Sequence, residues 1–183
     1  MTWPSAEPLE TARLLLEPLA VRHAIEMINA LGAQELYRYI GGEPPSMKGL
    51  QAQYERQSRG QSPDGKTGWL NWIVRDRTSD RAIGFVQSSL SYNDGALIAD
   101  IAWLITPSEQ GRGAAVEASS AVLDWLRTLH PRRIRALIHP DHAASARVAE
   151  RLGLARTSAL VGGETVWETA PIPSDVVKRS SGQ

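Results

Sequence analysis

The sequence contains no cysteine, a single phenylalanine and no excess of charge of either sign. The lack of cysteine excludes disulfide bonds, zinc–thiolate sites and thiol nucleophiles, so a covalent enzyme would have to use Ser, Thr, Lys or a carboxylate. The 20 Lys and Arg residues balance the 20 Asp and Glu residues. This balance provides no overall field to attract nucleic acid or an anionic membrane, and we expect neither among the partners.

Long apolar segments are also lacking. No run approaches the roughly 20 residues that cross a bilayer, and residues 1–8 lack the basic and apolar regions of a signal peptide. We therefore expect a cytoplasmic protein. A length of 183 residues suits one domain, predicted over residues 9–170 with flexible tails at 1–8 and 171–183. Both a monomer and a homodimer are compatible with the sequence.

Hydrophobic patterns predict strands and helices in alternation along the chain. Helices inserted among antiparallel strands indicate an α+β domain around one mixed sheet. His23 and His130 fall on helical segments as exposed residues, and we assign them no role. Strands are predicted over 13–19, 69–75, 82–88, 96–105, 133–138, 160–161 and 165–167, and helices over 22–31, 47–58, 115–129 and 143–152.

A glycine-rich loop separates the strand 96–105 from the helix 115–129. It reads Gln110-Gly111-Arg112-Gly113-Ala114-Ala115. A strand, a glycine-rich turn and a helix together direct backbone N–H groups out of the helix N-terminus toward an anion. Gly111 and Gly113 have no Cβ, so a phosphate can approach closely and a positive φ is permitted. The loop is therefore a candidate pyrophosphate cradle.

The loop has three other interpretations. An ordinary turn before a helix is common. A Walker loop requires Gly-Lys-Ser/Thr at its end, and none follows Gly113. A dinucleotide fingerprint requires three glycines and an acidic residue after the next strand, whereas that strand ends in His139-Pro140.

Several separated segments, taken together, resemble the GCN5-related N-acetyltransferase (GNAT) superfamily. The loop 110–115 matches that family's acetyl-CoA motif, Gln/Arg-x-x-Gly-x-Gly/Ala, and residues 139–154 resemble its second signature. Residues 11–16, Ile83-Gly84 and 100–103 resemble the subgroup of ribosomal-protein N-terminal acetyltransferases. The resemblance covers about residues 9–168.

The resemblance implies a GNAT fold and an acetyl-CoA cofactor. The fold would be a mostly antiparallel mixed sheet of six to seven strands, with splayed fourth and fifth strands and about four flanking helices. The pantetheine would pair with the open backbone edge of the fourth strand, here Trp103, Leu104 and Ile105. The pyrophosphate would lie on Gln110, Gly111, Arg112, Gly113, Ala114 and Ala115. Arg112 is either a phosphate ligand or a solvated loop charge.

The second signature departs from the family pattern at two positions. His142 replaces the usual Asn, and Ala149 stands where a tyrosine general acid is often found. In the ribosomal-type subgroup a serine of this signature has the acid role, which would fall on Ser145. The alternative is that Ser145 only bonds backbone in its helix. His142 is either a pantetheine contact or a surface histidine.

Asp100 is the candidate general base because a carboxylate inside a strand needs a reason to be there. Strand alternation places residues 100, 102 and 104 on one face and 101, 103 and 105 on the other. The alternative is a strand-end carboxylate paired with an arginine. Trp69 and Trp72 fall on opposite faces of their strand, so one of them could line an acceptor pocket.

The sequence thus predicts an acetyl-CoA-dependent N-acetyltransferase that acts on a primary amine without a metal. The amine could be a peptide α-amine, a ribosomal protein, a polyamine or an antibiotic. The alternatives are a catalytically silent protein that binds acetyl-CoA as a sensor or scaffold, and an unrelated binding module with a similar loop.

Overall fold

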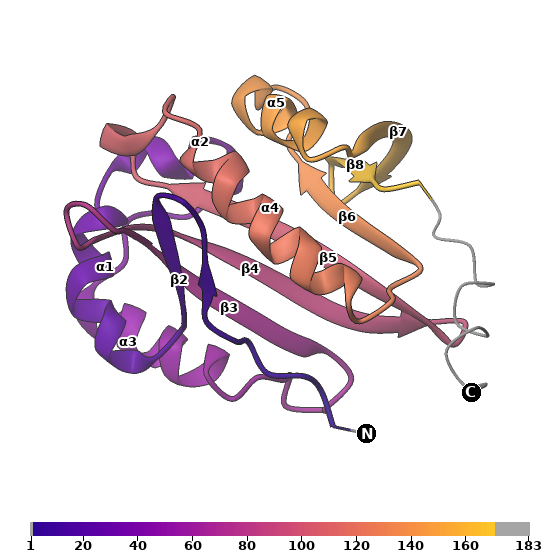
Figure 1. Cartoon of the computed structure of the whole chain (residues 1–183), viewed down its shortest axis with the longest axis horizontal. Coiled ribbons are helices and arrows are strands. Elements are labelled where there is room, and N and C mark those ends of the chain that lie inside the picture. The colour runs from indigo at the N-terminus through magenta and orange to yellow at the C-terminus, as the bar shows by residue number, and fades with distance from the viewer. Residues whose placement is uncertain (1, 171–183) are drawn as a thin grey trace.

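The computed structural model describes residues 2–170, and the tail predicted at 171–183 lies outside them. The described residues form an α+β domain on one sheet with the strand order β1-β2-β3-β4-β5-β6-β8-β7 (Figure 1). This confirms the predicted class, and the short β1 makes eight strands where six to seven were expected. The strands are β1 (Leu9–Glu10), β2 (Leu14–Pro18), β3 (Gly68–Asp76), β4 (Arg81–Asn93), β5 (Ala96–Ile105), β6 (Arg133–Ile138), β7 (Ala155–Val161) and β8 (Glu164–Glu168).

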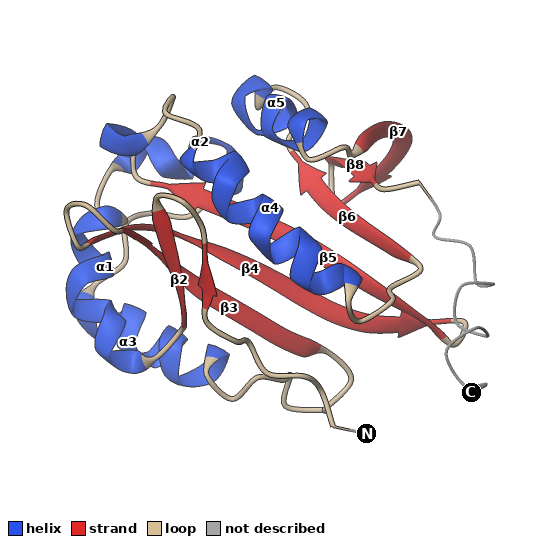
Figure 2. Ribbon diagram, in the orientation of Figure 1, coloured by secondary structure: helices blue, strands red, loops and turns tan. Residues whose placement is uncertain are grey.

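The helices cover both faces of the sheet (Figure 2). The side chains of α4 at Ala118, Val122 and Leu126 repeat every four residues and are fully buried, so one stripe of the helix packs on the sheet. Helix α3 begins after Ser46, whose Oγ accepts a hydrogen bond from the Gly49 N–H. The helices are α1 (Ala24–Ala30), α2 (Tyr37–Ile40), α3 (Met47–Gln57), α4 (Ala114–Arg127) and α5 (Ala143–Arg151).

The sheet opens between β5 and β6. All other neighbouring strands are antiparallel, whereas β5 and β6 are parallel and pair only at residues 98–100 with 133–135. Beyond Asp100, β5 stays paired with β4 as far as Ile105, and β6 turns to pair with β8. The two strands therefore diverge, as the resemblance predicted for the fourth and fifth strands of the fold.

Two cores lie on opposite faces of the sheet. Ile101 and Ile105 of β5 pack with the buried residues of α4, on what we call the α4 face. Leu104 packs with Met27 of α1 and Leu50 of α3, on what we call the α1 face. Because strand side chains alternate, Asp100 and Ala102 share the α1 face with Leu104.

The N-terminal segment makes contacts along the sheet, where the sequence had predicted a flexible tail. The Trp3 Nε1–H donates to the Gly65 carbonyl at 2.9 Å, and the Trp72 Nε1–H donates to the Glu7 carbonyl at 2.7 Å. The Trp3 ring lies against Gly68, where a Cβ would come within 2.7 Å of it. A glycine in β3 is thus required by the packed indole.

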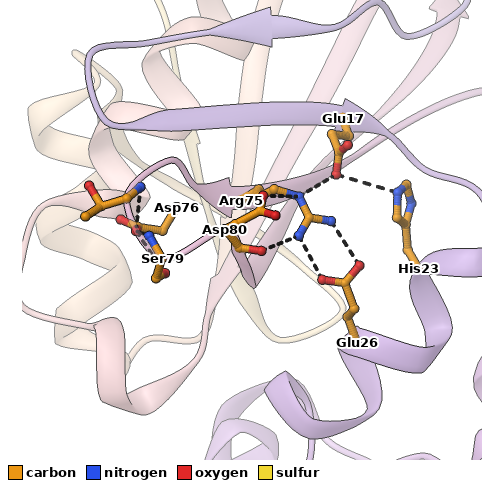
Figure 3. A network of polar contacts seen from close by, with 8 residues as sticks. Glu17, His23, Glu26, Arg75, Asp76, Ser79 and Asp80 are labelled. Carbon is orange, nitrogen blue, oxygen red and sulfur yellow. Dashed lines mark hydrogen bonds and ion pairs between the residues drawn. The ribbon is translucent and has the colours of Figure 1, made fainter.

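A polar network fixes the start of α1 against β2 and β3 (Figure 3). The Arg75 guanidinium donates to Glu17 at 2.9 Å and to both oxygens of Glu26 at 2.8 and 3.0 Å. His23 is only 2% exposed, and its Nδ1 accepts from the Ala20 N–H at 3.0 Å. The prediction that His23 is exposed is wrong, because its helical turn faces this network. His130 is exposed, as predicted.

Candidate acetyl-CoA site

The loop before α4 has the geometry of an anion cradle. Gly111 has a φ of 75° and Gly113, the N-cap of α4, a φ of 82°, which is the left-handed region that glycine adopts without strain. The first helical bond runs from the Glu117 N–H to the Gly113 carbonyl. Within residues 2–170, the backbone N–H groups of residues 111–116 have no protein acceptor, as expected at a helix N-terminus.

Two side chains of the loop turn away from these N–H groups. The Gln110 Nε2–H donates to the Ile105 carbonyl at 2.8 Å and ties the loop to the end of β5. The Arg112 guanidinium donates to Glu109 at 2.8 Å, and Glu109 also accepts from Arg81 at 3.0 Å. The geometry therefore favours the interpretation of Arg112 as a loop charge with a partner of its own.

The turn between β1 and β2 is attached to the first turn of α4. Glu117 accepts hydrogen bonds from the Thr11 hydroxyl at 2.6 Å, the Arg13 N–H at 3.0 Å and the Arg13 Nε–H at 2.7 Å. Burial alone would raise the pKa of Glu117, but these bonds outweigh it and lower the pKa below its ordinary value. The Arg13 side chain is 53% exposed, and such exposed pairs contribute only about 0–1 kcal/mol.

Arg13 lies beside the cradle, which sequence reasoning did not anticipate. Its Nη1–H donates to the Arg112 carbonyl at 3.0 Å, and its Nη2 lies 3.5 Å from where a Cβ on Gly113 would be. The segment 11–16 carried part of the family resemblance, but about 100 residues of sequence separate it from the loop. A local pattern therefore gave no signal for this contact.

The end of β5 offers an unpaired backbone edge next to the cradle. Residues 101–105 pair with β4 on one side and with no strand on the β6 side. The side chains of Leu104 and Ile105 are buried and that of Trp103 is half-buried, so a ligand would meet mainly the backbone of this stretch, apart from the Ile105 carbonyl that Gln110 already engages. Gly84 of β4 packs so closely here that a Cβ would lie 2.9 Å from the Ile105 Cα.

Ser145 stands in the first turn of α5 with its hydroxyl uncommitted. The side chain is half-buried, and its Oγ makes no hydrogen bond to any residue from 2 to 170. It shares a helix face with buried Ala149 one turn later, the face that α5 directs at the domain. The backbone-bonded alternative for Ser145 is therefore not what the geometry shows.

Asp100 forms a bidentate ion pair with Arg135 at the last paired position before β5 and β6 diverge. The Arg135 Nε–H and Nη2–H donate to the two carboxylate oxygens at 2.8 and 2.9 Å. Burial is partial, with 31% of each side chain exposed. The pair is the strand-end carboxylate bound to an arginine that the sequence left open as the alternative to a general base, and it fixes the carboxylate on the α1 face. Each oxygen still has a lone pair that Arg135 does not use.

His142, the N-cap of α5, stacks on Tyr39 of α2. The two rings lie 4.4 Å apart at 22°, and Tyr39 also meets His139 at 5.5 Å and 41°. Burial, with a smaller effect of His139, lowers the pKa of His142, so its imidazole is neutral at pH 7. Helix α2, which the sequence analysis missed, thus reaches the end of β6 and the start of α5.

A cavity of about 420 Å³ opens beside this stack. One wall is α2 with the residues after it, and the other is the β7–β8 turn. Glycines occur on both walls, so backbone groups are accessible there. The lining residues are Tyr39, Ile40, Gly41, His139, Gly162, Gly163 and Glu164.

A second cavity, of about 370 Å³, lies between α5 and the strands β6, β7 and β8. Trp167, Thr165 and Glu150 contribute to its lining. No residue of β5 or of the loop 110–115 lines it, so it is separate from the cradle.

These features provide an anion cradle next to an open strand edge, and a serine hydroxyl in the first turn of α5. The cradle fits a diphosphate because N–H groups converge on it without a Cβ in the way. The open edge fits an amide-bearing chain that pairs as an added strand. Both groups occur in acetyl-CoA.

Among residues 2–170, no helix combines the length and hydrophobicity of a membrane span.

Comparison with known proteins supports this assignment. The family model of the acetyltransferase (GNAT) domain matches residues 13–155. A search of the curated proteins gave no significant match.

Solved structures share the fold at low sequence identity. AAC(6')-Ib in complex with paromomycin and acetyl-CoA has a TM-score of 0.72 at 16% identity, covering 93% of this chain and 99% of that one. A Vibrio cholerae protein provisionally assigned as a ribosomal-protein-serine acetyltransferase has a TM-score of 0.69 at 17% identity, covering 90% of this chain and 98% of that one. An acetyltransferase from Agrobacterium tumefaciens has a TM-score of 0.69 at 22% identity, covering 93% of this chain and 98% of that one. With the family match, the site and the fold in agreement, this chain belongs to the GNAT acetyltransferases and is an acetyltransferase with acetyl-CoA as its co-substrate.

Proposed function

We propose that this protein transfers the acetyl group of acetyl-CoA directly to a primary amine in a ternary complex. The observation that carries the proposal is the row of unpaired N–H groups at residues 111–116 next to the unpaired edge of β5. Gly111, Arg112, Gly113, Ala114 and Ala115 would hold the diphosphate through their backbone N–H groups, and Gln110 would fix the loop to the end of β5. The backbone of Trp103, Leu104 and Ile105 would pair with the pantetheine.

The two faces of the sheet would separate donor from acceptor. The cradle and Ser145 belong to α4 and α5, whereas Asp100, Ala102 and Leu104 face α1. A donor entering from the α4 side and an amine entering from the α1 side would meet in the gap between β5 and β6. Such an arrangement holds the reacting groups together without a covalent enzyme intermediate.

Bound acetyl-CoA supplies the acyl group as a thioester. A C–N bond forms to the amine, the C–S bond breaks, and one proton must leave the amine while another reaches the thiolate. We propose that Asp100 receives the first through water, using a lone pair that Arg135 does not occupy. Ser145 donates the second, and a backbone N–H of 103–105 donates to the carbonyl oxygen. His142 would then support Ser145 by fixing the start of α5 and bordering the pantetheine.

A protein or peptide α-amine is the acceptor that the cavity beside Tyr39 supports best. Its two walls present the backbone of Gly41 and of Gly162-Gly163, which suits an extended chain that enters between them. The similarity to the Vibrio cholerae structure agrees with the ribosomal-protein subgroup. A small-molecule amine is the other acceptor class, as in the AAC(6')-Ib complex with paromomycin.

A second candidate function is acetyl-CoA binding without turnover. The observation in its favour is the bidentate Asp100–Arg135 pair, which engages both oxygens of the carboxylate in a structural contact. Ala149 at the usual position of a tyrosine acid also fits a silent protein.

The deciding experiment is calorimetric titration with acetyl-CoA, followed on the same sample by thiol release against peptides, polyamines and aminoglycosides. We expect binding and release with at least one peptide amine. Binding without release from any class would favour the silent protein. No binding of acetyl-CoA would overturn the cradle.

A further inference from the structure

We propose that Arg13, from the turn before β2, is a phosphate ligand of the acetyl-CoA site. The inference rests on the proposed cradle and adds to it a side chain that is remote in sequence. The chemistry recognised is a phosphate group of the nucleotide, either its diphosphate or its 3′-phosphate.

The contacts of Arg13 leave part of its guanidinium available. Nε–H and Nη2 serve Glu117 at 2.7 and 2.6 Å, and Nη1 serves the Arg112 carbonyl at 3.0 Å. A guanidinium has five N–H donors, so one donor on each of Nη1 and Nη2 has no partner within residues 2–170. The side chain is 53% exposed, and these donors can reach a ligand from solvent.

The position of Arg13 is electrostatically unusual for a merely structural residue. A helix N-terminus carries partial positive charge and disfavours a neighbouring cation, yet Nη2 lies 3.5 Å from the Cβ position of Gly113, the N-cap of α4. Glu117 offsets the charge of Arg13 but leaves the N–H groups of 111–116 unpaired. Two sources of positive potential therefore converge on one point, which is the arrangement that binds phosphate.

Arg112 does not fill this role. Its guanidinium is anchored by a single contact, to Glu109 at 2.8 Å, and its side chain is 69% exposed, so within residues 2–170 no contact holds it against the first turn of α4. Glu117 holds the Arg13 side chain through Nε and Nη2. Glu117 also accepts hydrogen bonds from the Arg13 backbone N–H and the Thr11 hydroxyl. This bracing fixes the guanidinium before any ligand arrives, which lowers the entropic cost of binding.

Arg77 provides a matched control. It is also an exposed arginine, in the turn between β3 and β4, and it donates from Nη1 to the Thr11 carbonyl and from its backbone N–H to the Arg13 carbonyl, both at 2.9 Å. Within the described residues it forms no hydrogen bond or ion pair with α4 or the loop 110–113. Substitution of Arg77 removes a positive charge and a hydrogen bond to the turn that carries Arg13, but it leaves the proposed phosphate contact of Arg13 in place.

The test is calorimetric affinity of wild type, Arg13→Gln, Arg13→Lys and Arg77→Gln for CoA and for dephospho-CoA, which lacks the 3′-phosphate. Thermal unfolding of each variant is measured alongside. Loss of one charge-assisted hydrogen bond predicts CoA binding about tenfold weaker in Arg13→Gln, with Arg77→Gln within twofold of wild type and Arg13→Lys between them. The weakening should diminish in high salt.

Comparison of CoA with dephospho-CoA shows whether Arg13 binds the diphosphate or the 3′-phosphate. Equal weakening for CoA and dephospho-CoA assigns Arg13 to the diphosphate, and weakening for CoA alone assigns it to the 3′-phosphate. Unchanged affinity in Arg13→Gln, or equal losses in Arg13→Gln and Arg77→Gln, would overturn this proposal while leaving the cradle in place. A wild type that binds neither ligand would overturn the cradle itself, and this inference with it.

Discussion

The proposed donor side and the proposed acceptor side of this domain are built in different ways. The cradle consists of backbone N–H groups on consecutive residues, 111–116, and glycines make those groups accessible. The acceptor side draws Tyr39, His139 and Glu164 from three distant segments. Backbone recognition leaves a short motif in the sequence because glycine is required at fixed positions. Side-chain recognition from separate elements leaves none, so the donor can be inferred from sequence and the acceptor cannot.

The largest effect should come from Gly113→Val. A valine at a φ of 82° is strained by about 1–2 kcal/mol or more, and its branches would cover the N–H groups of the cradle. We expect acetyl-CoA affinity to fall at least about a hundredfold, since several charge-assisted bonds are lost together. Calorimetry provides the measurement.

Gly95→Val is the control for this substitution. Gly95 has a φ of 76° with open space around it, in the turn between β4 and β5 at the far end of β5 from the cradle. The Gly95→Val variant should lose stability to a degree similar to Gly113→Val and keep the wild-type affinity for acetyl-CoA. A matching loss of affinity in both variants would show that strain, and not the cradle, is responsible.

Ser145→Ala tests the chemistry of the donor side. Removal of a general acid typically lowers turnover about 10²-fold or more, and the dissociation constant of acetyl-CoA should change little because the cradle is untouched. Steady-state kinetics with saturating acetyl-CoA measures the effect. Ser108→Ala, at an exposed position before the loop, should behave as wild type. Full turnover in Ser145→Ala would return this serine to a structural role.

Tyr39→Ala tests the acceptor side. Tyr39 lines the proposed acceptor cavity, and loss of an aromatic contact worth about 0.5–1.5 kcal/mol should raise the KM for the acceptor amine up to about tenfold. The affinity for acetyl-CoA should change less, because only the stack that holds His142 is lost on the donor side. Tyr39→Phe keeps the ring and should resemble wild type. If Tyr39→Ala weakened only acetyl-CoA, the division between the two sides would be wrong.

The smallest effect concerns pH and the network at α1. Burial, followed by the nearby Arg22, lowers the pKa of His23, so the folded state favours neutral imidazole. The unfolded state then binds more protons than the folded state. The contribution of His23 to the free energy of unfolding is therefore fully present above its ordinary pKa of 6.5, and it is lost as the pH falls below that value toward the lowered pKa of the folded state. Protonation would also place a second donor opposite the Ala20 N–H.

Urea unfolding at pH 7.5 and 5.5 measures this loss of stability. His23→Asn offers an amide oxygen as acceptor without a titrating group, and its stability should change less between the two pH values. The same pH dependence in both proteins would assign the effect to other groups.

Much of the fold followed from local pattern. The predicted strands 96–105 and 133–138 coincide with β5 and β6, and the helices 115–129 and 143–152 differ from α4 and α5 only at their ends. These elements have clear periodicity and sharp stops at Pro107, Pro131 and Gly153. Helix α2 has four residues and no apolar stripe, and β1 has two residues, so neither produces a periodic signal.

The side chains of the candidate site were harder to place. Asp100 was recognised as unusual in a strand, but only the parallel pairing of β5 with β6 brings Arg135 opposite it. His23 was misplaced because its helix faces Arg75, which lies on a strand about 50 residues later. Partners of charged side chains are set by strand register and helix orientation, and single-sequence patterns do not encode either.

Local patterns in the chain establish the composition limits, the α+β class and the glycine loop, because hydrophobic period and glycine's backbone freedom act over a few neighbouring residues. The folded arrangement alone brings Arg13 to the cradle, Arg135 to Asp100 and Tyr39 to His142. Each of these contacts joins segments far apart in the chain, and packing of the sheet between its two cores is what brings them together.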